Sequence, residues 1–272
     1  PPILPSEPGR TDEIQALDGR ISQILNDVLH DPRFQALESL WRSVVFLLSK
    51  VEVRSGLRVY IVDVTKDELA ADLLGTDDPT KWSTGSLFLS PVSENQEDLR
   101  WAGLVGAYEF GGAEDDVPLQ RIGFLAEAAE VPWFAAGHPA LFGCGNPAHE
   151  PDPRDWTEPV DPRWSHLRGN SEASWIHLAY PGFLLRSPYE PGEGKRGDVP
   201  FLEIVESADD LLWGHAGLLC GMAMAEAFAE AGWGARVPGS FTVANVPVPT
   251  VKESWAAPVQ VLLSNTGASE VR

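Results

Sequence analysis

Residues 104–136, with the sequence LVGAYEFGGAEDDVPLQRIGFLAEAAEVPWFAA, decide the fold class of this chain. The apolar segment Leu104–Tyr108 is compatible with a strand, and residues 116–118 have the composition that opens a helix, which we expect to run to about Glu130. Residues 131–136 are again apolar. This alternation favours an α/β layer, so the sequence predicts a mixed sheet with flanking helices.

Two amphipathic helices are predicted before this layer, and they form an N-terminal helical segment, residues 1–50, ahead of an α/β body, residues 51–272. The first helix is expected over residues 11–29, and Asp31 is the predicted N-cap of the second. The apolar stripe of the first helix consists of Ile14, Leu17, Ile21, Ile24, Leu25 and Val28. The stripe of the second helix, which we expect to be buried, consists of Phe34, Leu37, Trp41, Val44, Val45 and Leu48.

Other segments of the body have weaker signals. Residues 57–61 alternate apolar and polar side chains, which predicts a strand, and residues 65–68 have the composition of a capping box for a following helix. Residues 137–169 are rich in Pro, Gly, Asp and Trp without a period, so we expect a long ordered loop there. Residues 208–231 have the composition of a helix, and residues 258–263 that of a last strand.

Composition excludes some classes of partner and compartment. Forty acidic residues against twenty basic ones give a formal net charge of −20, which would repel nucleic acid. The two cysteines are too few for a disulfide framework and fit a reducing compartment, so we expect a cytoplasmic protein. No apolar run approaches the roughly 18 to 20 residues that a membrane span needs, and we expect no membrane insertion.

Local motifs for catalysis or for metal or cofactor binding are absent from the sequence. No Gly-x-Ser-x-Gly elbow, phosphate-binding glycine loop, His-x-x-x-His or Cys-x-x-Cys spacing occurs. We therefore predict no catalytic, metal-binding or cofactor-binding residue. The alternative hypothesis is a soluble, hydrolase-like enzyme that uses Cys144, His138 or His149 in the loop 137–169.

Four blocks, in order, resemble the large sheath subunit of the type VI secretion system, the TssC or VipB family. Residues 30–42, HDPRFQALESLWR, are similar to the family's "HPxFQxLExxWR", and residues 106–110, GAYEF, to "GDYEF". Residues 131–143, VPWFAAGHPALFG, are similar to "PFIAAASPALFG", and residues 181–189, PGFLLRSPY, to "LPRFLLRLPYG". The resemblance assigns structural roles to Phe34, Leu37, Trp41, Arg42, Tyr108, Glu109, Phe110, Pro139, Phe142, Phe183, Arg186, Trp213 and Gly214.

The resemblance implies a structural protein that is not an enzyme. Such a subunit pairs with a small sheath subunit, polymerises around an inner tube protein and contracts; a baseplate and an AAA+ unfoldase stay open as further partners. The chain stops where family members continue, so we expect a truncated or compact member. A baseplate-associated or regulatory binding module that does not polymerise is a further alternative.

The first helix is the expected partner interface, through Ile14, Leu17 and Ile21. Its apolar stripe could pack on this chain or on a partner subunit, and we expect a mixed case in which Ile24 and Val28 are internal and the N-terminal part of the stripe is shared with the partner.

Overall fold

The computed structural model describes residues 8–51, 57–93, 100–144, 156, 162–190, 201–234, 246–247 and 259. Its main sheet is parallel with the order β1-β2-β3, and a separate antiparallel pair is formed by β4 and β5. The strands are β1 (Leu104–Phe110), β2 (Trp133–Gly137), β3 (Ile176–Ala179), β4 (Phe183–Leu184) and β5 (Trp213–Gly214). The mixed α/β architecture with N-terminal helices is confirmed.

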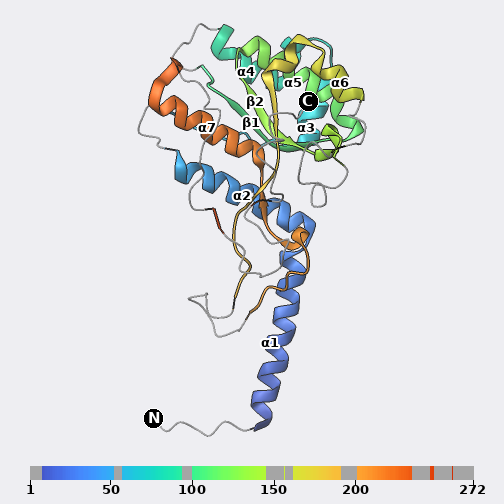
Figure 1. Ribbon diagram of the computed structural model, residues 1–272, viewed down its shortest axis with the longest axis vertical. Coiled ribbons are helices and arrows are strands. Elements are labelled where there is room, and N and C mark those ends of the chain that lie inside the picture. The colour runs from blue at the N-terminus through green and yellow to red at the C-terminus, as the bar shows by residue number, and fades with distance from the viewer. Residues whose placement is uncertain are drawn as a thin grey trace.

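Helices cover both faces of the main sheet (Figure 1). One face is covered by α5, which connects β1 to β2 and packs on α3, α4 and α6, while α7 crosses the other face. The α-helices of the body are α3 (Lys66–Leu74), α4 (Ser83–Ser93), α5 (Asp116–Ala129), α6 (Pro162–Arg168) and α7 (Ala216–Ala231). The 3-10 helices are η2 (Pro79–Lys81), η4 (Ala113–Asp115), η5 (Pro139–Phe142), η7 (Ser171–Trp175), η8 (Ala208–Asp210) and η9 (Gly232–Gly234).

The core of the body lies between α5 and the sheet. Every residue of β2 is buried, because a central parallel strand has helices on both of its faces. Ile122 and Ala126 of α5 are almost completely buried in the same hydrophobic core as Trp133 and Ala135 of β2. On the opposite face α7 comes very close to β2 at Gly217, where a Cβ atom would lie 2.7 Å from the backbone of Ala135. Glycine at this position therefore permits the close approach of helix and strand.

Two helices precede the body, α1 (Pro8–Leu29) and α2 (Pro32–Lys50). Both were predicted, and so was the cap between them: a carboxylate oxygen of Asp31 accepts hydrogen bonds from the backbone N–H groups of Arg33 and Phe34. In Figure 1, α2 lies alongside α7, whereas α1 extends away from the body. The predicted capping box of α3 is likewise confirmed at Thr65 and Glu68.

Three sequence predictions about the body are wrong in part. Residues 57–61 form no strand although the structure describes them; exposed side chains such as Tyr60 and Ile61 face both sides of the segment, so neither side is buried as a sheet face would be. The helix expected over 208–231 begins only at Ala216, because β5 precedes it. The loop 137–169 contains η5 and α6 in its described part. Of the strand expected at 258–263, the structure describes only Val259, which bridges to Phe183.

Candidate interaction surface

The apolar stripe of α2 faces solvent, which corrects the expectation that it is buried. Trp41, in the middle of the helix, is 57% exposed. Its exposed neighbours along the stripe are Phe34, Leu37, Val45 and Leu48, and Val44 at the margin is half-buried.

The buried face of α2 is instead made of small polar residues. Ser39 and Ser43 are the buried residues of this helix, and at 100° per residue they lie opposite the apolar stripe. The Ser39 hydroxyl donates a hydrogen bond to the Trp213 carbonyl of β5 at 2.5 Å, and the Ser43 hydroxyl accepts one from the His215 N–H at 3.3 Å. Because serine is small and its hydroxyl is bonded here, α2 can approach β5 and the start of α7 closely.

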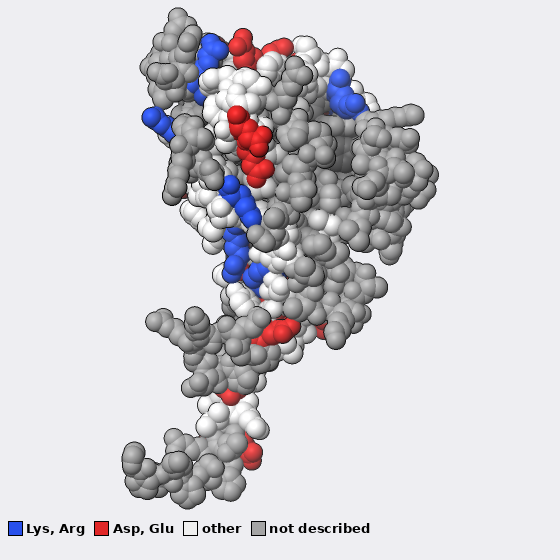
Figure 2. Space-filling view, turned by 60° about the vertical axis from the view of Figure 1, so that its left-hand side comes forward, with Lys and Arg blue, Asp and Glu red and all other residues white. Residues whose placement is uncertain are grey.

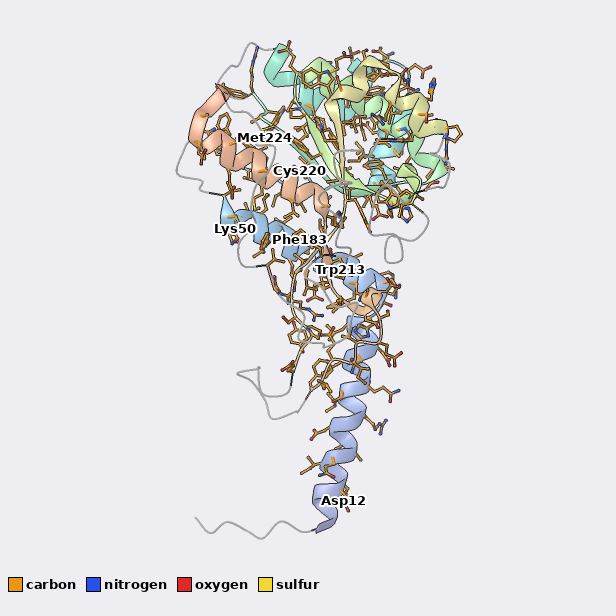
Figure 3. The ribbon with its side chains drawn as sticks, viewed as in Figure 1. Asp12, Lys50, Phe183, Trp213, Cys220 and Met224 are labelled. Atoms are coloured by element: carbon orange, nitrogen blue, oxygen red, sulfur yellow. The ribbon has the colours of Figure 1, made fainter. Side chains whose placement is uncertain are left out.

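The apolar stripe of α1 also faces away from the body. Ile14 and Leu17 are 51% and 55% exposed, and Ile21, Ile24, Leu25 and Val28 are exposed as well. The expectation that Ile24 and Val28 are internal is therefore wrong within the described chain. Figure 3 shows α1, with Asp12 near its outer end, projecting beyond the other side chains drawn.

Asn26 attaches α1 to the body on the opposite side of the helix. Its amide oxygen accepts a hydrogen bond from the Ile204 N–H at 2.8 Å, and its amide nitrogen donates to the Leu202 carbonyl at 3.3 Å. Asn26 is buried, in contrast to the apolar residues of α1. A polar residue among apolar ones was the sequence signal for this contact. That signal does not identify the partner, Leu202, which lies 176 residues further along the chain.

A buried ion-pair network, which we call the joint, fixes α2 to the segments 183–190 and 201–206. The Arg186 guanidinium binds both carboxylate oxygens of Glu203, at 2.6 and 3.1 Å, and one oxygen of Glu38 at 3.1 Å. It also stacks on the Tyr189 ring, 4.4 Å from the centroid. Burial lowers the pKa of Arg186, but the two carboxylates outweigh it and raise the pKa above its ordinary value. The arginine therefore stays charged.

Two more side chains extend the joint toward the N-terminal helices. Arg42 donates to the same Glu38 oxygen at 2.7 Å and to the Tyr189 hydroxyl at 3.1 Å. His30, in the turn between α1 and α2, lies with Nε2 3.4 Å from a Glu203 oxygen. Arg42 and Arg186, which the family resemblance singles out in blocks far apart in sequence, are thus brought together in space.

The remaining motif residues lie within the body. Phe110 and Phe183 are buried, and the Tyr108 hydroxyl donates to the Val64 carbonyl at 2.6 Å. Glu109 is exposed, and its backbone carbonyl accepts a hydrogen bond from Lys66. Pro139 is buried in η5, Trp213 is half-buried, and a Cβ atom at Gly214 would lie 2.7 Å from the Phe183 ring. Phe142 lies in η5, but its side chain is outside the described set.

In the part of the chain that the structure describes, the residues of the alternative enzyme hypothesis do not come together as a catalytic group. Cys144 is completely buried, whereas His138 is exposed and its Nδ1 accepts a hydrogen bond from the Ala140 N–H at the start of η5. His149 lies outside the described residues. Burial, together with the nearby Cys144 and Glu109, raises the pKa of Tyr180 to about 12, so this hydroxyl is protonated at neutral pH.

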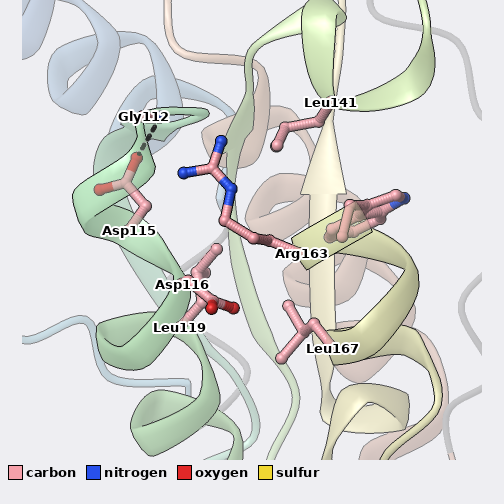
Figure 4. A pocket seen from close by; sticks show the side chains of 8 residues that line it. Gly112, Asp115, Asp116, Leu119, Leu141, Arg163 and Leu167 are labelled. Carbon is pink, nitrogen blue, oxygen red and sulfur yellow. Dashed lines mark hydrogen bonds between the residues drawn. The ribbon is translucent and has the colours of Figure 1, made fainter. Parts of the chain in front are cut away.

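A small hollow beside α5 is too narrow for a substrate (Figure 4). Its volume is about 20 Å³, which is room for about one water molecule. Asp115 at its edge accepts hydrogen bonds from the N–H groups of Gly111 and Gly112 at 2.7 and 2.8 Å and pairs with Lys66 at 2.6 Å. The Asp115 carboxylate therefore already binds the backbone N–H groups that could otherwise hold an anion at this sheet edge. The hollow is lined by Gly112, Asp115, Asp116, Leu119, Leu141, Arg163, Trp164 and Leu167.

Charge and metal-ligand chemistry do not distinguish another site among the residues that the structure describes. Within that set no group of three or more His, Cys, Asp or Glu could hold a metal ion. On the face shown in Figure 2, the described basic and acidic side chains form small separate groups. None of the described helices combines the length and the apolar character needed to cross a lipid bilayer.

The geometry defines a class of α/β protein in which two N-terminal helices expose apolar stripes. The family described as "VipB: EvpB/VC_A0108, tail sheath N-terminal domain" matches residues 11–270, and the chain therefore belongs to this family of structural, non-enzymatic sheath proteins. The chain is also 27% identical over 236 residues to the type VI secretion system sheath protein TssC1 of Pseudomonas aeruginosa. That match covers 83% of this chain and 47% of TssC1, so the chain spans about half the length of this relative.

Proposed function

We propose that this chain is a structural subunit of a type VI secretion contractile sheath, which pairs with a small sheath subunit and polymerises in the cytoplasm around an inner tube. The proposed contact with the small subunit is the N-terminal part of the α1 stripe, Ile14, Leu17 and Ile21. Family membership supports the sheath role in general. The observation that carries the specific contact is the outward direction of this stripe.

An exposed apolar stripe of this length needs a cover. Exposed apolar surface that continues over several residues marks an interaction site more often than scattered apolar side chains do. The body of this chain binds α1 through Asn26 on the opposite side and leaves the stripe open. A partner subunit that covers the stripe would remove about 25 cal/mol of unfavourable free energy for each Å² of apolar surface buried.

The test is co-purification with a co-expressed small sheath subunit from the same organism. Leu17→Asp places a charge on the stripe and should abolish co-purification, while the melting temperature of the isolated chain stays within a few degrees of the parent. Gln15→Asp is the matched control, because Gln15 is exposed on α1 but lies off the stripe. Retention of the small subunit by Leu17→Asp contradicts the proposed contact.

A further inference from the structure

The spacing of the α1 stripe fits another α-helix as its cover. Ile14, Leu17, Ile21, Ile24 and Val28 follow one another at steps of three, four, three and four residues. This repeat averages 3.5 residues and places the five side chains at the a and d positions of a heptad. Leu25, the sixth residue of the stripe, takes the e position beside this seam.

The back of α1 is already bound to the body, so the seam of a and d side chains is directed outward. Asn26 occupies the f position of this heptad, which lies opposite the seam on the helix. Both of its amide atoms bond the extended segment at Leu202 and Ile204. A partner helix can therefore lie along the seam without displacing any contact that Asn26 makes.

The positions that flank the seam are mostly acidic. Glu13 and Asp27 are at g positions and Asp18 is at an e position. The other two e and g positions between Glu13 and Asp27 hold Arg20 and Leu25. The four charged side chains are exposed or half-exposed. The charged side chains visible on the outer part of α1 in Figure 2 are acidic. In coiled coils the e and g residues decide which partner is accepted.

We propose that α1 accepts a helix whose own flanking positions carry Lys or Arg, and that its acidic flanks reject a second copy of itself. This proposal rests on the proposed function, because it describes the helix that a partner subunit must supply. In a parallel pair of two α1 helices, Glu13 of one copy would face Asp18 of the other. Opposed like charges destabilise such a pair, whereas basic residues there would form interhelical ion pairs.

Two synthetic peptides of three heptads test the proposal on the full chain. Both have Leu at every a and d position; one has Lys and the other Glu at every e and g position. Fluorescence anisotropy should show that the Lys peptide binds about tenfold tighter than the Glu peptide at low salt. The difference should shrink at about 1 M salt, where the screening length falls to roughly 3 Å. A scrambled Lys and Leu peptide, which has no seam, should not bind.

Charge reversal on α1 supplies the decisive control. Glu13, Asp18 and Asp27 changed together to Lys should invert the preference between the two peptides. The same reversal at Asp209, Glu226 and Glu230, three exposed acids of the body, changes the net charge equally and should leave the preference as in the parent.

Each other result overturns the proposal. Equal binding of the two peptides, or an equal effect of both triple variants, shows that the flanks of α1 do not select its partner. Binding of neither peptide shows that the seam does not take a helix. Either result can occur while Leu17→Asp still abolishes co-purification with the small sheath subunit, so the two hypotheses fail separately.

Discussion

The helices α2 and α5 have similar apolar periodicity and opposite burial. In α5, Leu119, Ile122 and Leu125 are buried against the sheet and its neighbouring helices. In α2, the apolar stripe around Trp41 is exposed, and Ser39 and Ser43 face the body. Periodicity therefore establishes that a helix has an apolar face, but the surrounding fold decides whether the same chain or another covers it. Free energies of unfolding measure that difference.

The largest loss of stability is expected at the joint that holds α2 to the body. Arg186→Ala removes the cation from Glu203, whose side chain is only 1% exposed, and from the nearly buried Glu38. Removing one partner of a buried ion pair costs about 3–5 kcal/mol, because the remaining charge stays desolvated. Urea denaturation of the isolated chain measures this loss.

Arg33→Ala is the matched control for the joint. Its side chain is 93% exposed and, among the described residues, pairs with Asp31 at the start of the helix. Surface ion pairs of this kind contribute little. An Arg186→Ala curve that superimposes on the Arg33→Ala curve would show that the joint does not stabilise the attachment of α2.

The next loss is expected in the core beneath α5. Ile122 is 1% exposed and packs between the helix and the sheet. Ile122→Ala leaves a cavity, and such changes cost about 2–5 kcal/mol. The same urea titration measures it, and Phe124→Ala, at an exposed position on the same helix, should cost much less. Equal costs at the two positions would mean that α5 buries a different face.

A smaller effect is expected at a cap inside the body. Asp72 of α3 accepts hydrogen bonds from the Ser83 and Thr84 N–H groups at the start of α4, at 2.9 and 3.0 Å. Burial raises the pKa of Asp72, but these bonds and the Thr84 hydroxyl outweigh it and lower the pKa below 3.8. A lowered folded-state pKa means that the stabilisation is present above about pH 3.8 and is lost as the pH falls through the folded value.

Asp72→Ala should therefore cost about 1 kcal/mol at neutral pH, the usual value of a cap. The difference between parent and variant should disappear in acid. Thermal melting at a series of pH values from neutral to below 3 checks both parts. A difference that persists unchanged at the lowest pH would show that the charge of Asp72 is not what caps α4.

The fold was predictable where its signals are local. The strand at Leu104, the helix after Asp116 and the cap at Asp31 each depend on residues within a few positions of one another. The joint was not predictable, because Arg186 meets Glu38 across 148 residues and no local pattern pairs them. Family resemblance singled out Arg186 but not Glu203, its main partner.

The direction of α2 was not predictable for a different physical reason. Hydrophobicity alone places an apolar stripe inside, and by that rule Trp41 belongs to the core. Where α2 meets the body, it lies against the backbone of β5 and the small residues of α7. Serine hydroxyls can bond this backbone and fit there better than large apolar side chains. The candidate partner residues Ile14, Leu17 and Ile21 remain a prediction that co-purification has to test.

The smallest effect on stability is expected at Trp41. This substitution distinguishes most directly between a helix with an exposed apolar stripe, such as α2, and one with a buried stripe, such as α5. A buried tryptophan replaced by alanine costs about 3–5 kcal/mol, but surface changes away from special contacts stay within about 0.5 kcal/mol. Because Trp41 is 57% exposed, Trp41→Ala should leave the urea midpoint of the isolated chain nearly unchanged. Phe46→Ala, on the body side of the same helix, removes a ring that lies 5.1 Å from the Phe183 ring and should lower the midpoint clearly. If Trp41→Ala lowered it as much as Phe46→Ala, the isolated chain would bury its α2 stripe, and α2 would behave like α5.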